Sequence, residues 1–369
     1  MKSRKLLMIP GPVEFEKEVL EAVGVPSPSH VAPEFIHSFG NALDMMKKVW
    51  QSPGGQAFIV AGTGTLAMDI AGSNLIEAGD RALVISTGYF GERYADLLKR
   101  YGADVVILRA PPGQTVPLDI IEKEISTGDY KLMTFTHVDT STAVRNNPEP
   151  IGELGKKYDV LTILDGVCSV GGEEICQEEW GIDVVLTASQ KAIGVPPGLA
   201  LLVVSQKAIE VWRNRKTAVT NYYADWDNWL PIMEAYSAGK PSYFGTPAVN
   251  LILGLEKSLQ LILQEGLEKR IRRHQMISET FRKGIESFGL NMIPKHRELC
   301  ANTLSAIFYP ENVDGGDFIS KVNEAGVIIA GGLLSDLKSK YFRVGHMGKV
   351  DTEDIRQTLD AIGHAIDNC

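Results

Sequence analysis

Seven short apolar runs lie in the first part of the chain, and they constrain the fold more than any other feature. They are Ala57–Ala61, Ala82–Ser86, Asp104–Leu108, Leu132–Val138, Val160–Leu164, Val184–Ala188 and Leu199–Ser205. Most are continuous runs of Val, Ile and Leu, as expected for strands covered on both faces. Helical patterns such as Glu92–Tyr101 and Pro150–Tyr158 separate them. This alternation predicts an α/β domain with a mainly parallel, seven-stranded sheet and helices on both sides.

The later part of the chain has a different pattern. Val249 to Phe288 is strongly helical, and it is followed by short strand candidates and a terminal helix from about Thr352. This order predicts a smaller α+β C-terminal domain. Pro10-Gly11-Pro12 cannot continue a regular element, so the first residues are expected to form an extended arm. The expected divisions are an arm over residues 1–15, a large domain over 16–262 and a small domain over 263–369.

Composition excludes several classes of protein. The 369 residues are 44% hydrophobic and 22% charged, with a net charge of −9, which argues against nucleic-acid and anionic-membrane partners. No apolar run is long enough for a signal peptide or a membrane span. The four cysteines lack metal-type spacing and are too few for a disulfide framework. We therefore expect a cytoplasmic protein without a metal site.

Two residues at the ends of these apolar runs indicate a specific chemistry. Asp165 ends one run, and Lys191 follows another in the segment Ser189-Gln190-Lys191. Ligands of α/β sheets bind at the carboxyl ends of the strands. A lysine can hold an aldehyde cofactor as a Schiff base, and a carboxylate can keep a pyridine nitrogen protonated. Either residue alone is compatible with an ordinary strand end, but the pair indicates a pyridoxal 5′-phosphate site.

Three further segments follow strands of the predicted sheet. Thr63-Gly64-Thr65 opens a helix and can bind an anion, although a lone Gly-Thr-Gly is more often a simple cap. Tyr89 can stack on a planar ring, and the hydroxyls of 140–142 can bond a cofactor, but plain turns are the ordinary alternative. Arg343 is suited to gripping a substrate carboxylate, yet a surface salt bridge is the more common use.

Together these motifs resemble a known family. Leu164-Asp165-Gly166-Val167, Ser189-Gln190-Lys191-Ala192 with Pro196-Pro197-Gly198, the Gly-Thr-Gly turn and Arg343-Val344-Gly345 are similar to motifs of the class V, fold-type I aminotransferases. Within that family the chain is most similar to the alanine–glyoxylate (serine–pyruvate) aminotransferases. The likeness runs from Ile9-Pro10-Gly11-Pro12 to Gly345-His346-Met347-Gly348.

The resemblance implies a role for each matching residue. It makes Lys191 the Schiff-base residue, Asp165 the partner of the pyridine nitrogen, and Arg343 the clamp of the substrate carboxylate, with Gly11 beside the substrate. Tyr89 and Val167 would cover the two ring faces. The remaining cofactor positions are Thr140 at the ring, Thr63, Gly64, Thr65 and Gln190 at the phosphate, and Tyr243 and Thr246 reaching the phosphate from the other subunit of a homodimer. Tyr89 and Thr65 depart from the tryptophan and histidine of some relatives.

The implied activity is a ping-pong transamination from a small amino acid, alanine or serine, to glyoxylate or pyruvate. Three alternatives stay open. A cysteine desulfurase of the same fold would need a nucleophilic cysteine on a mobile loop, and Cys300 lacks an evident loop context. A phosphoserine aminotransferase would need extra basic residues for the substrate phosphate. A nucleotide-binding or catalytically silent α/β protein would bind no cofactor of this kind.

Overall fold

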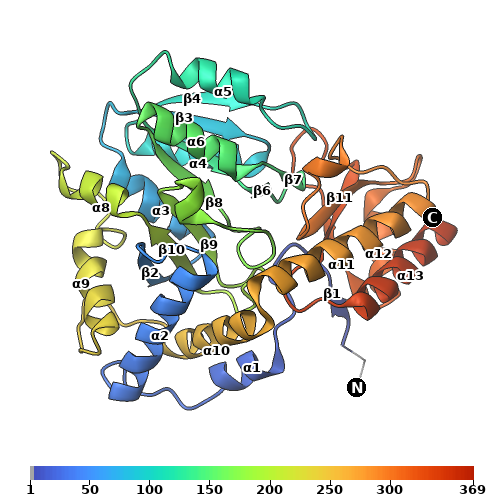
Figure 1. Ribbon diagram of the computed structural model, residues 1–369. Coiled ribbons are helices and arrows are strands. Elements are labelled where there is room, and N and C mark those ends of the chain that lie inside the picture. The colour runs from blue at the N-terminus through green and yellow to red at the C-terminus, as the bar shows by residue number, and fades with distance from the viewer. Residues whose placement is uncertain (1–3) are drawn as a thin grey trace.

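A seven-stranded sheet forms the centre of the large part of the molecule. The computed structural model describes residues 4–369 and is drawn in Figure 1. The strands follow the order β2 (Gln56–Ala61), β10 (Leu199–Val204), β9 (Val184–Ala188), β8 (Leu161–Asp165), β5 (Tyr130–Thr136), β3 (Arg81–Ser86) and β4 (Asp104–Arg109). Only β10 runs antiparallel to its neighbours. The predicted α/β class and the mainly parallel seven-stranded sheet are confirmed.

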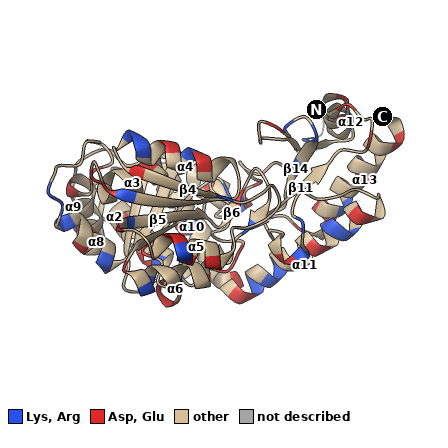
Figure 2. Cartoon of the chain, turned by 90° about the horizontal axis from the view of Figure 1, so that it is seen from above, with Lys and Arg blue, Asp and Glu red and all other residues tan. Residues whose placement is uncertain are grey.

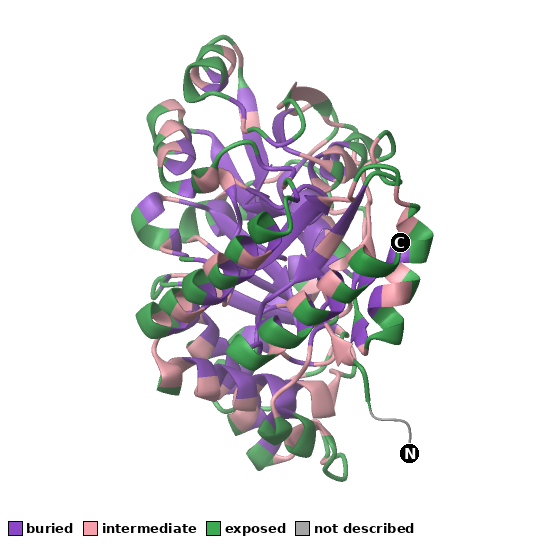
Figure 3. Cartoon of the chain, turned by 90° about the vertical axis from the view of Figure 1, so that its right-hand side faces the viewer, coloured by how far each residue is buried: buried purple, intermediate pink, exposed green. Residues whose placement is uncertain are grey.

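Helices cover both faces of this sheet, which explains the continuous apolar runs. The helices of this part of the chain are α1 (Lys17–Val23), α2 (Pro33–Val49), α3 (Gly64–Leu75), α4 (Tyr89–Arg100), α5 (Leu118–Ile125), α6 (Pro148–Tyr158), α7 (Gln177–Trp180), α8 (Gln206–Arg213), α9 (Trp226–Ser237) and α10 (Val249–Glu265), of which α1 and α10 pack on each other. In Figure 2, α3 and α4 lie on one side of the sheet and α5 and α6 on the other. Every residue of β8, β9 and β10 is buried as a result. Figure 3 shows these buried strands enclosed by helices with exposed outer turns.

The C-terminal part of the chain forms a smaller domain, in which helices pack on a three-stranded sheet. Its elements are α11 (Leu267–Ser287), a 3-10 turn (Arg297–Leu299), β11 (Leu304–Phe308), α12 (Gly315–Glu324), β12 (Val327–Ile328), β13 (Ala330–Gly331), β14 (Tyr341–Gly345) and α13 (Thr352–Asn368). Strands β11, β14 and β13 pair antiparallel in that order. Phe281, Phe318 and Phe342 form the centre of its separate apolar core. Helix α10 ends at Glu265, and the next residue, Gly266, has a φ of +85° that suits glycine, so the chain turns just after the predicted boundary at 262/263.

The N-terminal segment belongs with the small domain in space. Strand β1 (Leu6–Leu7) pairs parallel with β12, and Met8 is fully buried in the apolar core of the small domain. The chain then crosses to the large domain, where the backbone N–H of Val13 donates to the carbonyl of Gln190 at 3.2 Å. The predicted arm over residues 1–15 thus bridges the two cores, and its first three residues lie outside the described residues.

Residues 4–369 contain neither a membrane-spanning helix nor a cluster of metal-ligating side chains. None of the helices there combines the length and the apolar composition that crossing a bilayer requires. The same residues contain no group of three or more His, Cys, Asp or Glu side chains arranged to hold a metal ion.

The burial of Met8 generates a stability prediction. Met8→Ala removes a fully buried side chain from the small-domain core and should lower the free energy of unfolding by about 2–4 kcal/mol. Met276→Ala is the matched control, because Met276 is 55% exposed on α11 of the same domain and its truncation should change stability by less than about 0.5 kcal/mol. Urea titration of both variants measures the difference. Equal effects would mean that the arm does not pack as described.

Candidate active site

A cavity of about 150 Å³ opens at the carboxyl ends of the central strands. Residues that follow β2, β5, β8 and β9 line it, together with side chains from α3 and α4. The predicted residues in the lining are Thr63, Gly64, Thr65, Thr140, Asp165, Val167, Gln190 and Lys191. Sequence reasoning did not assign Met68, Phe90, Arg93, Thr136, Val138 and Cys168, which also line it. The fold therefore gathers most of the predicted positions, which are far apart in the sequence, around one space.

Asp165 is a buried carboxylate at the end of β8. It is 2% exposed, and its Oδ1 accepts a hydrogen bond of 3.0 Å from the backbone N–H of Val167. Burial raises its pKa to about 6, and the nearby charge of Asp139 adds to this, while the Val167 N–H, Lys191 and Arg93 oppose it. No ion pair within 4.0 Å satisfies it among residues 4–369. A cationic group in the cavity would supply the partner that this carboxylate lacks.

Lys191 follows β9 and meets the N-terminal arm inside the cavity. Its Nζ donates a hydrogen bond to the carbonyl of Pro10. Gly11 has a φ of +95°, and a Cβ built on it would lie 2.5 Å from Lys191 Cδ. Only glycine allows the arm to pass this close to the lysine side chain. The arm therefore limits the space on one side of Lys191.

The start of α3 has the chemistry of an anion site. Thr63 precedes the helix in an extended conformation, and its hydroxyl makes no capping bond to the helix. The first N–H groups of α3 thus point outward with the positive end of the helix dipole. Opposite them, Gln190 lines the cavity, and its buried Oε1 has no hydrogen-bond partner in the described part of the chain. The free N–H groups of α3 and the Thr63 hydroxyl can donate to the phosphate of the predicted cofactor, and Gln190 can do so only through its Nε2, because its Oε1 is an acceptor.

Phe90, and not the predicted ring-stacking residue Tyr89, lies in the cavity lining. Tyr89 is 38% exposed. Helix α4 begins at Tyr89, where the backbone N–H groups of Tyr89 and Phe90 donate to Ser141 Oγ and Asp139 Oδ2, each at 3.0 Å. These two bonds fix the first turn so that the second aromatic residue faces the cavity. The Thr-Gly-Tyr-Phe motif alone does not say which of the adjacent rings points inward.

Arg343 lies next to the cavity but does not line it. On β14, its Nε donates to the carbonyl of Gly331 at 2.8 Å and its Nη1 to the carbonyl of Thr140 at 3.2 Å. Burial lowers the pKa of its guanidinium, and the nearby Tyr341, Cys168 and Asp139 oppose that effect. The side chain of Thr140 lines the cavity, so the small domain delivers a guanidinium to its edge. A surface salt bridge, the alternative from the sequence, is not what the structure shows.

Tyr243 and Thr246 lie outside this cavity. Both are exposed in the segment between α9 and α10, and Tyr243 is 64% exposed with its ring 5.4 Å from that of His30. Neither residue lines the cavity of its own chain, so neither contacts a cofactor bound there. Their assignment to the site of another subunit stays a prediction.

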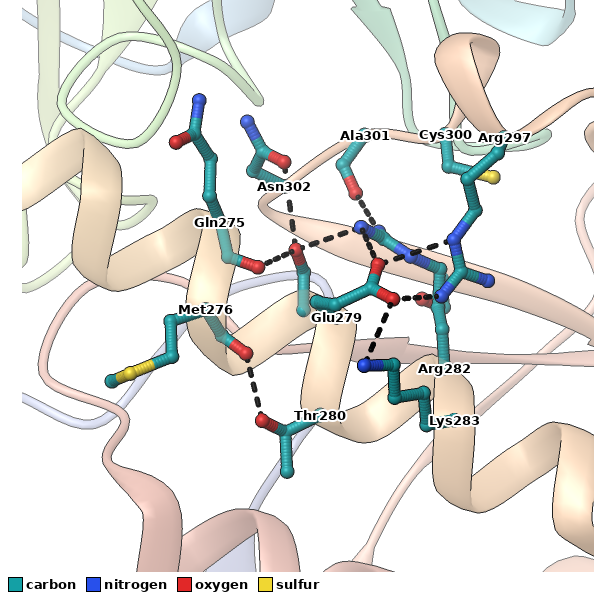
Figure 4. A network of polar contacts seen from close by, with 12 residues as sticks. Gln275, Met276, Glu279, Thr280, Arg282, Lys283, Arg297, Cys300, Ala301 and Asn302 are labelled. Carbon is teal, nitrogen blue, oxygen red and sulfur yellow. Dashed lines mark hydrogen bonds and ion pairs between the residues drawn. The ribbon is translucent and has the colours of Figure 1, made fainter.

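Neither cysteine near the site has the setting of a mobile nucleophile. Cys300 is buried within the polar network of Figure 4, where Arg282 donates to the carbonyl of Ala301 at 2.8 Å and Glu279 pairs with Arg297. Burial raises the pKa of its thiol, opposed by the arginines around it. Cys168 lines the cavity, but its Sγ lies 2.7 Å from Thr140 Oγ1 in a fully buried position. A cysteine held in this way is inert core.

The buried charge of Asp165 generates a pH prediction. The pKa is about 6 in the folded protein and about 4 in an unfolded chain, so the folded state binds more protons between these values. The contribution of Asp165 to stability therefore falls as pH rises from 4 to 7. Asp165→Asn removes this loss, and the cofactor-free variant should gain on the order of 3 kcal/mol relative to wild type across that range. Urea unfolding at several pH values measures the gain.

Exposed Asp129 provides the control for this experiment. Asp129→Asn replaces an exposed side chain and should change the free energy of unfolding by less than about 0.5 kcal/mol. A stability difference between Asp165→Asn and wild type that stays constant from pH 4 to 7 would mean that the Asp165 carboxylate is not desolvated.

Comparison with known proteins agrees with this geometry. The class-V aminotransferase family model matches residues 18–350. Alanine–glyoxylate aminotransferase 1 of Saccharomyces cerevisiae is 40% identical over 362 residues, covering 94% of this chain and 93% of that protein. Serine–glyoxylate aminotransferase of Arabidopsis thaliana is 30% identical, with 94% and 86% covered.

A solved structure gives the same result for the fold. The crystal structure of alanine–glyoxylate aminotransferase from Nostoc sp. superposes with a TM-score of 0.94 at 32% identity, covering 99% of this chain and 96% of that one. The prediction of a fold-type I structure is thereby confirmed. The chain belongs to the class V aminotransferases and is a pyridoxal phosphate-dependent enzyme.

Proposed function

We propose that this enzyme transfers the amino group of a small amino acid, alanine or serine, to glyoxylate or pyruvate by a ping-pong mechanism. The observation that carries the proposal is the cavity in which Lys191 and buried Asp165 lie together beside the anion site of α3. The relatives named for alanine–glyoxylate and serine–glyoxylate transfer support the choice of donors and of glyoxylate. A cytoplasmic location stays a prediction.

The cavity residues divide into three groups for holding the cofactor. Bound pyridoxal phosphate supplies an aldehyde for the amine and an electron-poor ring that accepts the electrons of the substrate Cα–H bond. Thr63, Gly64, Thr65 and Gln190 would receive the phosphate. Asp165 would face the pyridine nitrogen, and its raised pKa shows why a protonated ring nitrogen is a favourable partner. Val167 and Phe90 would cover the ring faces, with Thr140 at the edge.

Lys191 is the group that moves protons in this proposal. With the cofactor and an amino acid bound, its Nζ would take the proton from the substrate Cα and hold it for return. The carbonyl of Pro10 accepts a hydrogen bond from Nζ and fixes where this amine lies. General acid–base catalysis by a positioned group of this kind contributes about 10²–10⁴-fold.

Arg343 and Gly11 would select the substrate. The guanidinium at the edge of the cavity can bind a carboxylate bidentately, and its bonds to the carbonyls of Gly331 and Thr140 hold it in place. Gly11 brings the arm against Lys191, since a Cβ on it would lie 2.5 Å from Lys191 Cδ. The arm on this side of the lysine would favour amino acids with short side chains.

A cysteine desulfurase activity is the less favoured candidate. That chemistry requires a cysteine thiolate that can reach the substrate. Cys300 is buried under its arginine network, and burial raises the pKa of its thiol. A phosphoserine aminotransferase would need basic residues for the substrate phosphate in addition to those that bind the cofactor. Activity with phosphoserine as the amino donor would favour that alternative.

We also propose a homodimer whose subunits share active sites. The exposed aromatic side chains of Tyr222, 75% exposed, and Tyr243, 64% exposed, lie on the large domain beside Phe244, whose ring centroid is 5.5 Å from that of Tyr222. Large aromatic side chains are unusual on free surface and common in interfaces. Tyr243 and Thr246 would reach the cofactor phosphate of the partner subunit.

Replacement of the lysine tests the mechanism. Lys191→Ala should remove the visible absorbance of the lysine-bound cofactor and lower kcat for alanine with glyoxylate by about 10²–10⁴-fold. Lys207→Ala is the control, since Lys207 pairs with Asp159 on the surface away from the cavity. The assay includes alanine, serine, aspartate, phosphoserine and cysteine as donors with both acceptors. Retention of the absorbance band in Lys191→Ala would contradict the assignment, and sulfide release from cysteine would favour the desulfurase.

Subunit mixing tests the shared site. The protein should have a molar mass of about twice 40.3 kDa by light scattering. Lys191→Ala and the double variant Tyr243→Ala/Thr246→Ala should each be impaired alone. Hybrid dimers formed from the two contain one site with neither change, so activity should exceed the sum of the separate preparations. Absence of any recovery, with subunit exchange verified, would place Tyr243 and Thr246 outside the site.

A further inference from the structure

Arg93 is the one charged side chain of the cavity lining that the proposed function does not use. The charged residues of the lining are Asp165, Lys191 and Arg93. Asp165 and Lys191 have roles at the ring nitrogen and at the reacting carbon. Arg93 projects into the same space from α4, one turn after Phe90. Arg93 is only partly buried, so water still reaches its guanidinium, and its place in the lining puts a permanent positive charge where a bound anion could meet it.

The contacts of Arg93 place it at the anion site of α3. Its Nη1 donates to Thr65 Oγ1 at 3.3 Å, and its Nη2 donates to the hydroxyl of Tyr89 at 3.2 Å. Its Cζ lies 5.0 Å from the ring centroids of both Tyr89 and Phe90. The guanidinium thus lies between the predicted phosphate position and the aromatic ring predicted to stack on the cofactor.

No carboxylate lies within ion-pair distance of Arg93 in residues 4–369, although its charge acts on Asp165 from farther away. None of the ion pairs there includes it. The nearest acidic residue in sequence, Glu92, is already engaged by Arg109, which donates to both of its carboxylate oxygens at 2.9 Å. The partners of Arg93 are neutral hydroxyls and ring faces. Most of its hydrogen-bonding capacity, five N–H donors, therefore stays available to a ligand.

The charge of the phosphate supplies the missing partner. A phosphate ester of this kind carries about −1.5 to −2 charges at neutral pH, whereas hydroxyls, backbone N–H groups and the Gln190 amide are all neutral. The helix terminus adds only about half a positive charge. We propose that Arg93 is the cationic ligand of the cofactor phosphate and reaches it from α4 across Thr65. This inference rests on the proposed place of the phosphate at the start of α3.

The stacking of Arg93 gives this assignment a second consequence. A guanidinium held against Phe90 and Tyr89 loses little further freedom on binding an anion, so its hydrogen bonds cost less entropy than those of a free side chain. Phosphate binding by Arg93 and ring stacking by Phe90 are then coupled through direct contact. Lysine at this position would keep the charge but lose the planar fork and the stacking.

The test compares two ligands that differ only in the phosphate. Cofactor-free enzyme is titrated calorimetrically with pyridoxamine 5′-phosphate and with pyridoxamine, neither of which needs the covalent link to Lys191. Arg93→Gln should raise the Kd for pyridoxamine 5′-phosphate by about 10- to 100-fold, the effect of one charge-assisted hydrogen-bonded pair. The Kd for pyridoxamine should change less than about twofold. Arg93→Lys should fall between wild type and Arg93→Gln.

Two controls separate this inference from its premise. Arg100→Gln removes a charge from the exposed end of the same helix and should change neither Kd. Thr63→Ala probes the phosphate position without touching Arg93 and should also weaken pyridoxamine 5′-phosphate selectively. If Thr63→Ala has this effect and Arg93→Gln does not, the role of Arg93 is wrong while the phosphate site stands. If neither is selective, the phosphate lies elsewhere.

Other outcomes also overturn the proposal. Equal weakening of both ligands by Arg93→Gln, with folding verified by circular dichroism, would mean that Arg93 supports Phe90 and the ring instead of the phosphate. An unchanged Kd for both ligands, together with a raised KM for aspartate as donor, would assign the guanidinium to a substrate carboxylate. Arg93→Lys distinguishes these cases from misfolding, because it preserves the charge and most of the volume.

Discussion

The site depends on one constraint, a carboxylate buried at the end of a strand without a cation of its own. Asp165 ends β8 in the middle of the sheet, with β5 and β9 on either side, so its backbone cannot shift to bring the carboxylate to water. One N–H, from Val167, is all that the surrounding backbone offers it. The resulting pKa of about 6 means that the free protein tolerates this charge poorly. A protonated heterocycle relieves that cost, which links cofactor binding directly to the geometry of the sheet.

The other parts of the chain supply hydrogen-bond donors to the cavity around Asp165 and set its boundaries. The large domain supplies most of the lining, but both ends of the chain contribute through the small domain. The arm passes from the core around Met8 to the carbonyl of Pro10 beside Lys191, and β14 places Arg343 against Thr140. A shift of the small domain would therefore move the arm and Arg343 together.

Much of this arrangement could be predicted from the sequence, for reasons that are local. Strands covered on both faces are continuous apolar runs in the sequence, and a polar residue at their carboxyl ends stands out, which identifies Asp165 and Lys191. Residues on helices have no such signal. The sequence does not tell at which residue α4 begins, and so not whether Tyr89 or Phe90 faces the cavity, because the acceptors Asp139 and Ser141 that fix this turn lie on a distant loop. Arg93 likewise follows no strand, although its spacing from Phe90 puts both on one helical face.

The positive groups of the cavity have to attract anionic ligands to a protein that is acidic as a whole. Substrate carboxylates, 2-oxo acids and the cofactor phosphate are all anions, whereas the protein carries a net charge of −9. At physiological ionic strength charges beyond about 8 Å are largely screened, so the distant acidic surface repels these ligands only weakly. Inside the cavity screening is slight, and Lys191, Arg93 and Arg343 lie within or at the edge of one space that holds a single carboxylate. The local excess of positive charge, and not the sign of the whole molecule, therefore decides which ligands enter.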